Sequence, residues 1–227
     1  TAWLEKAEAL ARKGQRVLAV ASRRVPADHT VLSARDLQDS LCLLGLVGLI
    51  DPPRQEAISA VQTCLNAKIQ VKMITGDHAG TAQAIGKQLG LTHTDKVLTG
   101  TELDALSDDQ LKEAVQHTDV FARTTPEHKL RLVMALQSLG LTVSMTGDGV
   151  NDAPSLKRAD AGVAMGLKGS EAAKEAAEGV LADDNFASIA AAVEQGRTVY
   201  ANIKKVVSWT LPTNAGEALT IIVALLA

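Results

Sequence analysis

The chain has 227 residues, which is enough for one or two domains with a hydrophobic core. Its formal net charge is -3, and its aromatic residues are two Trp, one Tyr and two Phe. This composition excludes a general nucleic-acid binder, which needs a basic surface and aromatic stacking platforms. Cys42 and Cys64 form no C-x-x-C motif and lie among apolar residues, so we expect two buried thiols in a reducing compartment.

The first elements in chain order are a helix and then a strand. Residues 1–24 have this pattern, and the β-like run spans Gln15 to Ala21. No signal peptide is expected, because no apolar segment follows the amphipathic start. Residues 25–40 are polar and loop-like. A continuous apolar run from Leu41 to Ile50 then predicts a buried strand, and Pro53 suits the first turn of a helix from Arg54 to Ala67.

Strands and helices alternate over the next part of the chain. The expected strands are 69–74, 118–122, 141–145, 161–165 and 179–181, and the expected helices are 81–89, 107–117, 125–139, 153–159 and 186–205. Gly90 and Gly140 suit helix ends, and Ser107 with Gln110 has the spacing of a capping box. The alternation predicts an α/β fold with a parallel, doubly wound sheet, in which ligands bind at the carboxyl ends of the strands.

The C-terminal run is apolar over the length of a membrane span. Val206 to Ala227 holds one charge, Glu217, and Lys204-Lys205 precedes it, which favours a membrane helix with its lysines on the cytoplasmic side. A buried core helix is the alternative, and Pro212 is costly in either setting. Because the sequence begins at Thr1 without Met and ends inside this run, we expect a piece of a longer chain.

The most informative segment is Met145-Thr-Gly-Asp-Gly-Val-Asn-Asp-Ala-Pro-Ser-Leu156. It follows a strand-like run and places two carboxylates, Asp148 and Asp152, in a turn that contains glycine. Glycine allows close backbone approach to a ligand, and carboxylates are hard ligands of the kind Mg²⁺ prefers. Taken alone, the segment is more often an ordinary surface turn.

Further polar residues follow other predicted strands. They are Asp51, Thr75, Gly76, Asp77, Arg123 and, in the first turn of a helix, Lys129. Each alone fits a turn, a helix cap or a surface cation. Together they predict a phosphoryl-transfer site. The Thr75 hydroxyl and Gly76 amide could hold phosphate oxygens, Lys129 could neutralise a phosphate, and Asp148 with Asp152 could hold Mg²⁺.

These residues resemble the motifs of P-type cation-transporting ATPases. The matching runs are Asp51-Pro-Pro-Arg54, Met73-Ile-Thr-Gly-Asp77, Pro126-Glu-His-Lys129, Met145 to Pro154, Ala164-Met-Gly166 and Leu181-Ala-Asp-Asp-Asn-Phe186. The resemblance implies a remnant of the nucleotide-binding domain over residues 1–40. It further implies a phosphorylation domain of the haloacid dehalogenase-like fold over 41–190, and the stalk and start of the fifth membrane helix over 191–227.

The resemblance also implies roles for individual residues. Thr75, Gly76 and Lys129 would hold the phosphoryl group, with Asp77 in the same catalytic motif. Asp148 would bind Mg²⁺, and Asn151 and Asp152 would order that site. The resemblance also implies that Arg16 and Arg123 would contact ATP, and that Asp51 would lie in the hinge that closes the nucleotide-binding domain.

The C-terminal run resembles the calcium pumps among the type II members. Asn214 and Glu217 match an Asn and a Glu that bind the transported cation, and three residues' separation puts both on one helix face. A carboxylate in a membrane span is a candidate functional residue. The alternative is a polar pair that stabilises helix packing. No Cys-Pro-Cys occurs, so heavy-metal pumps fit less well.

One departure from the family pattern is important. The family's phosphorylated residue is the Asp of Asp-Lys-Thr-Gly-Thr, which this sequence lacks. The resemblance places it upstream, in a multi-pass membrane protein whose other parts include an actuator domain and more membrane helices. The present segment would be mostly cytoplasmic, with ATP, Mg²⁺ and a cation as ligands. The alternatives are a soluble haloacid dehalogenase-like phosphatase, for which no Asp-x-Asp precedes the sheet, and a non-catalytic nucleotide- or Mg²⁺-binding module.

Overall fold

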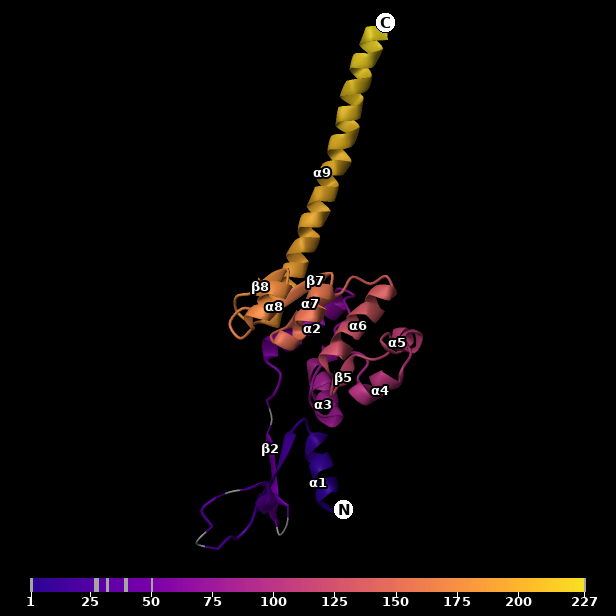
Figure 1. Cartoon of the computed structure of the whole chain (residues 1–227). Helices are drawn as coiled ribbons and strands as arrows, with labels where there is room; N and C mark the ends of the chain where they lie inside the picture. Colours follow the sequence, from indigo (N-terminus) through magenta and orange to yellow (C-terminus); the bar gives the residue numbers. More distant parts are fainter. Residues whose placement is uncertain (1, 27–28, 32, 39–40, 50, 227) are drawn as a thin grey trace. The chain divides into compact units, whose positions relative to one another are not determined.

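A computed structural model describes residues 2–26, 29–31, 33–38, 41–49 and 51–226 (Figure 1). The chain divides into two compact units, Thr1–Asp184 and Asn185–Ala227. The first unit is an α/β structure, and in the second the described residues form one long helix, α9 (Phe186–Leu226). The domain boundaries expected at 40 and 190 stay a prediction.

The first unit begins with a helix and a two-stranded antiparallel ribbon. Helix α1 (Ala2–Ala11) precedes β1 (Arg16–Ser22), as predicted, and a short 3-10 helix, η1 (Ala34–Leu37), lies in the connection to β2 (Cys42–Leu49). The ladder of β1 and β2 runs from the Arg16–Leu49 pair to the Ser22–Cys42 pair. Figure 1 shows this ribbon with α1 beside it.

Strand β2 is not the buried strand that its apolar sequence predicts. Most of its residues are exposed, including Leu44 at 63%. The reason is that β2 pairs with β1 outside the parallel sheets, and the described residues leave much of this ribbon uncovered. The prediction for Cys42 is likewise wrong because it is exposed, whereas Cys64 is buried as expected. The predicted last residue of this strand, Ile50, lies outside the described residues.

The rest of the unit alternates helices with parallel strands. The helices are α2 (Gln55–Asn66), α3 (Ala79–Leu89), α4 (Gly100–Ala105), α5 (Asp108–Ala114), α6 (Pro126–Ser138), α7 (Ala153–Arg158) and α8 (Glu171–Ala176), with a 3-10 turn, η2 (Val150–Asp152). The strands are β3 (Met73–Ile74), β4 (Val97–Thr99), β5 (Val120–Ala122), β6 (Ser144–Gly147), β7 (Ala161–Met165) and β8 (Gly179–Leu181).

Among the described residues these strands form two parallel ladders and not one. Their orders are β3-β5-β4 and β6-β7-β8, so β3 and β6 each lie at the end of a ladder. Each ladder has its own hydrophobic core, around Phe121 in the first and Leu156 in the second. Ile74 packs against both cores. The predicted parallel α/β fold is therefore confirmed, with a break in hydrogen bonding between β3 and β6.

Several element boundaries differ from the prediction. The strand expected at 69–74 is reduced to β3, because Lys68 adopts a left-handed φ of 62° and Ile69 N bonds back to Cys64 O. The strand expected at 141–145 starts later, at Ser144, which pairs with Ala161. Pro53 precedes the cap of α2 and is not in its first turn. Strand β4 and helices α4 and α8 were not predicted.

The predicted helix ends are confirmed where capping chemistry identifies them. Ser107 and Gln110 form a reciprocal capping box at α5. Thr125 caps α6 with Pro126 as its first residue. Gly90 ends α3 with a left-handed φ of 75°, which glycine adopts without steric cost.

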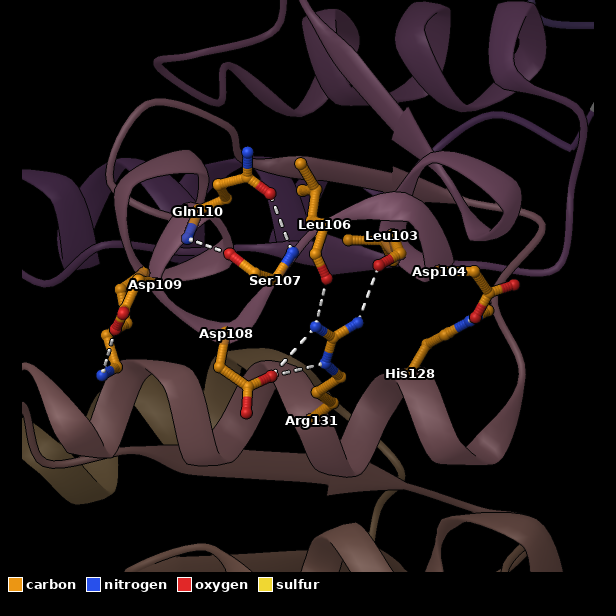
Figure 2. Close-up of polar contacts among 10 residues, drawn as sticks. Leu103, Asp104, Leu106, Ser107, Asp108, Asp109, Gln110, His128 and Arg131 are labelled. Carbon is orange, nitrogen blue, oxygen red and sulfur yellow. Dashed lines mark hydrogen bonds and ion pairs between the residues drawn. The ribbon is translucent and has the colours of Figure 1, made fainter.

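Arg131 joins α6 to the α4–α5 connection (Figure 2). Its Nη1 donates to Leu103 O at 2.7 Å, and its Nη2 donates to Leu106 O at 2.5 Å. Nε and Nη2 also donate to Asp108 Oδ1, at 3.1 and 2.9 Å. A guanidinium has donors in a planar fork, so one side chain satisfies the last carbonyls of α4 and the first residue of α5 together.

We expect Arg131→Met to lower the free energy of unfolding by about 2 kcal/mol, because two carbonyls lose charge-assisted hydrogen bonds. The matched control is Lys112→Met. Lys112 pairs at 3.0 Å with Asp109, whose side chain is 93% exposed, so we expect a loss within about 0.5 kcal/mol. Urea denaturation of both variants measures the difference, and equal losses would show that Arg131 does not anchor α4.

Candidate functional site

The turn after β3 holds Thr75, Gly76 and Asp77. Thr75 N donates to Phe121 O at 2.9 Å, which continues the ladder between β3 and β5. The Thr75 hydroxyl oxygen then accepts a hydrogen bond from Asp77 N at 3.1 Å. This local bond closes the turn, because a threonine hydroxyl can bond the backbone two residues on. Gly76, at the tip, is exposed.

The turn after β5 is fastened to the turn after β3. Thr124 donates to Thr75 O through its backbone N and its Oγ1, each at 3.2 Å. Arg123 N donates to Asp77 O at 3.1 Å. Arg123 has a left-handed φ of 53° and an exposed side chain. The carboxyl ends of these two strands therefore form one connected surface.

Arg16 reaches this surface from the start of β1. Its guanidinium forms an ion pair and hydrogen bond with the Asp77 carboxylate. This hydrogen bond, together with the negative charge of Asp77, raises the pKa of Arg16. Four predicted residues, Arg16, Thr75, Asp77 and Arg123, thus lie together. Asp51 is exposed and follows β2, which belongs to neither parallel ladder.

The turn after β6 is organised around the buried carboxylate of Asp152, which is 4% exposed. Its Oδ1 accepts from Lys129 Nζ at 2.5 Å. Its Oδ2 accepts from Asp148 N at 3.2 Å and from Gly149 N at 3.1 Å. A Cβ on Gly147 would lie 2.5 Å from the Asp152 Cβ, so only glycine lets the carboxylate fold back onto its own turn.

Asp148 and Asn151 have exposed side chains in the same turn. Asp148 is held by its main chain, because its N donates to Asp152 and its O accepts from Ser170 N at 2.8 Å. Within the part of the chain that the structure describes, no side chain bonds the Asp148 carboxylate, and no three His, Cys, Asp or Glu cluster as metal ligands. A single open carboxylate fits Mg²⁺, which commonly takes one or two protein carboxylates and completes its shell with water and substrate phosphate.

Helix α6 starts directly after the turn that follows β5, and its Lys129 binds Asp152 in the turn that follows β6. Thr125 N donates to His128 Nδ1 at 3.0 Å, and His128 N donates to Thr125 Oγ1 at 3.4 Å. Because Nδ1 accepts, the proton of His128 lies on Nε2, which donates to Asp104 Oδ1 at 2.7 Å. This cap fixes the helix start immediately before Lys129. Over the described ranges no hydrogen bond joins the Thr75 turn directly to the Asp148 turn.

Sequence reasoning missed Thr124, His128, Asp104 and Ser170. The signal for His128 was present, since it stands three residues after Thr125, but capping boxes are usually sought with Glu or Gln at that position. Ser170 contacts Asp148 only through its backbone, which no side-chain pattern reveals. A hollow of about 340 Å³ lies beside α1 and β2, and none of its lining residues belongs to the predicted site.

The second unit carries the other predicted residues, Asn214 and Glu217. Helix α9 is long and apolar enough to cross a membrane, judged by length and composition. Pro212 lies inside it without ending it, and the Thr213 hydroxyl donates to Trp209 O at 2.9 Å. Asn214 and Glu217 are both exposed along this helix.

The α/β fold agrees with the comparison to protein families. The haloacid dehalogenase-like hydrolase model matches residues 2–160, and the chain belongs to this family. It is 50% identical over 224 residues to "Cation-transporting ATPase pma1" of Synechocystis, which covers 98% of the chain and 25% of that protein. It is 53% identical over 227 residues to "Probable cation-transporting ATPase F" of Mycobacterium tuberculosis, with the same coverage.

A third relative is "Calcium-transporting ATPase" of Bacillus subtilis, which is 47% identical over 218 residues. That alignment covers 96% of the chain and 24% of the relative. The chain therefore spans about a quarter of the length of these proteins.

We expect Asp152→Ala to lower the free energy of unfolding by about 3 kcal/mol, because it leaves Lys129 unpaired and two turn amides without an acceptor. The matched control is Asp109→Ala, whose side chain is 93% exposed and pairs with Lys112 at the surface, so stability should change by less than about 0.5 kcal/mol. Denaturant unfolding measures both variants. Similar losses of unfolding free energy in the two variants would show that the Asp152 carboxylate does not stabilise this turn.

Proposed function

We propose that this chain is the phosphoryl-transfer segment of a longer ATP-driven cation pump of the P-type, called the parent pump below. The observation that carries the proposal is the Lys129–Asp152 pair beside the open carboxylate of Asp148, at the carboxyl ends of parallel strands. The family of the chain and the names of its relatives support the same reading.

Each residue of the site would have its own role. The Thr75 hydroxyl and the Gly76 amide would hold phosphoryl oxygens, and Lys129 would neutralise their charge. Asp148 would bind Mg²⁺, which when present polarises the phosphoryl group. Asp152 and Asn151 would order this turn. Because Asp152 binds both Lys129 and the backbone amide of Asp148, it would hold the Lys129 ammonium group and the Asp148 residue in fixed positions relative to each other.

The nucleophile of the proposed reaction lies outside the 227 residues, which contain no Asp-Lys-Thr-Gly-Thr. In the described part of the chain, β3 and β6 end their ladders and have no further strand partner, and Ile74 packs against both cores. We propose that the parent's strand with the phosphorylated aspartate pairs between β3 and β6, since unpaired strand edges favour the addition of a strand.

The N-terminal ribbon would belong to the nucleotide-binding domain of the parent. Arg16 and Arg123 would contact ATP phosphates, and Asp51 would lie in the hinge. The exposed apolar residues of the ribbon support this, because large apolar patches mark surfaces that another part of a protein covers. These residues include Leu18, Val20, Leu44 and Val47.

Helix α9 would contribute to the membrane path of the cation. Its 41 residues are about twice the roughly 20 needed to cross a bilayer, so its first half is long enough for a stalk. Asn214 and Glu217 would be cation ligands, and their spacing fits Ca²⁺ as the transported ion. The relatives named as calcium-transporting ATPases support this choice.

The alternative function is a non-catalytic binding module, which the open Asp148 carboxylate and the Lys129–Asp152 pair would also suit. A non-catalytic module could use the same turns to bind nucleotide and Mg²⁺ without turnover. Measurement of acyl-phosphate separates the two.

In the parent pump we expect Asp148→Asn to abolish phosphorylation from labelled ATP, because the only open carboxylate of the described turn after β6 is lost. The isolated chain should form no acid-stable acyl-phosphate with ATP and Mg²⁺. A wild-type phosphoenzyme level in the Asp148→Asn pump would refute the metal role. A phosphorylated aspartate in the isolated chain would refute the external nucleophile.

We expect Glu217→Gln and Asn214→Ala to raise the Ca²⁺ concentration that half-activates ATP hydrolysis by the parent pump, by about tenfold or more, since intramembrane carboxylates mark ion sites. The matched control is Thr220→Ala, because the Thr220 hydroxyl is already occupied by Gly216 O at 2.8 Å. Titrations with Ca²⁺, Mn²⁺, Na⁺ and K⁺ identify the ion. An unchanged ion dependence in both variants would exclude these two ligands.

A further inference from the structure

Asp184 follows β8 in the sequence, and its carboxylate binds the backbone of the loop after β7. Its Oδ1 accepts from Leu167 N at 3.0 Å and its Oδ2 accepts from Lys168 N at 2.9 Å. These backbone hydrogen bonds, that of Leu167 first, hold the pKa of Asp184 below its usual value. Asp184 also has a left-handed φ of 50°, a conformation that Asp and Asn adopt more readily than other non-glycine residues. Both carboxylate oxygens of Asp184 are therefore engaged by the backbone of one loop.

The loop that Asp184 holds, residues 166–170, is closely fitted to its surroundings. Gly166 N donates to Leu181 O at 2.8 Å, and a Cβ on Gly166 would lie 2.4 Å from that oxygen. A Cβ on Gly169 would lie 1.9 Å from Met165 O. The loop therefore depends on two close backbone approaches at its ends and on the Asp184 carboxylate between them.

The far end of this loop holds Asp148. Ser170 N donates to Asp148 O at 2.8 Å, while the Ser170 hydroxyl accepts from Ala173 N at 3.3 Å and caps α8. Asp148 is thus held on both sides of its main chain, by Asp152 at its N and by Ser170 at its O. Its carboxylate has no side-chain partner among the described residues, and these two contacts fix the backbone from which it projects.

We infer that Asp184 is a positioning residue for the Mg²⁺-binding carboxylate Asp148, acting through the loop 166–170. The inference rests on the proposed function. Asp152 holds the turn from the side of Lys129, and Asp184 holds it from the side of Ser170. Asp184, the loop 166–170 and Asp148 all belong to the first unit.

The test compares three variants of the parent pump, Asp184→Gly, Asp184→Asn and Asp160→Gly. Glycine removes the carboxylate but adopts the left-handed φ freely, so strain cannot explain its effect. Asn keeps one acceptor and also tolerates that conformation, which makes it the partial rescue and the fallback if the glycine variant does not fold. Asp160 is the matched control, because its carboxylate accepts from Val143 N at 2.8 Å and from Gln137 Nε2 at 3.1 Å, at the opposite end of β6.

Two readouts are needed. The first is the Mg²⁺ concentration for half-maximal phosphorylation from ATP. Asp184→Gly should raise this concentration about tenfold, because the loss of a residue that supports a metal ligand commonly weakens metal binding by that factor or more. Asn should cause a smaller rise, and Asp160→Gly none. The second is amide hydrogen exchange without Mg²⁺ or ATP. Asp184→Gly should speed exchange in residues 148–152 and 166–170, whereas Asp160→Gly should speed it only near Val143.

The outcomes distinguish a failure of the proposed function from a failure of the inference on Asp184. If Asp148→Asn leaves phosphorylation intact, the proposed function fails. If Asp148→Asn abolishes it but Asp184→Gly leaves the Mg²⁺ concentration and the exchange of 148–152 unchanged, the inference on Asp184 alone is overturned. Equal effects of Asp160→Gly and Asp184→Gly on both readouts would also overturn it, because they would indicate general loosening.

Discussion

The site depends on one buried carboxylate, that of Asp152. A buried charge is stable only when it is paired and hydrogen-bonded, and Asp152 meets this condition with one cation and two amides. The cation, Lys129, comes from α6, and the amides come from the turn after β6. The same group therefore closes its own turn and binds a separate helix, so neither partner can move without leaving a charge unpaired.

Helix α6 carries this constraint into the rest of the first unit. Its start is capped by Thr125 and His128, and His128 is bonded to Asp104 of α4. One turn further along, Arg131 binds the carbonyls at the end of α4. Lys129 lies between these two anchors in the sequence and pairs with Asp152. The helix is thus fixed to the β3-β5-β4 half of the unit by its anchors and to the β6-β7-β8 half by Lys129.

The elements that could be predicted from sequence are those with local chemical signals. Capping residues such as Ser107 and Thr125, and the left-handed Gly90, mark helix ends because their function is complete within a few residues. The parallel α/β class followed from the alternation of elements. The exposure of β2 could not be predicted. An apolar run indicates that a strand can be buried, but it does not show which residues cover the strand. Strand β4 is too short for a periodic pattern.

The sequence motifs name the residues of the candidate site but not the contacts that connect them. The motifs identified Asp148, Asp152 and Lys129, yet the structure is needed to see that Asp152 joins the other two. Backbone contacts such as Ser170 N to Asp148 O have no side-chain signal at all. Long-range partners such as Arg16 and Asp77, separated by 61 residues, meet only through the fold.

The most direct test of the account is a double-mutant cycle between Lys129 and Asp152 in the parent pump. The measured quantity is the rate constant of phosphoenzyme formation for Lys129→Met, Asp152→Asn and the double variant, converted to activation free energies. If the pair acts as a unit, the two effects should fall short of additivity by about 2 kcal/mol or more. Effects that add to within about 0.5 kcal/mol would show two independent residues and would contradict the account.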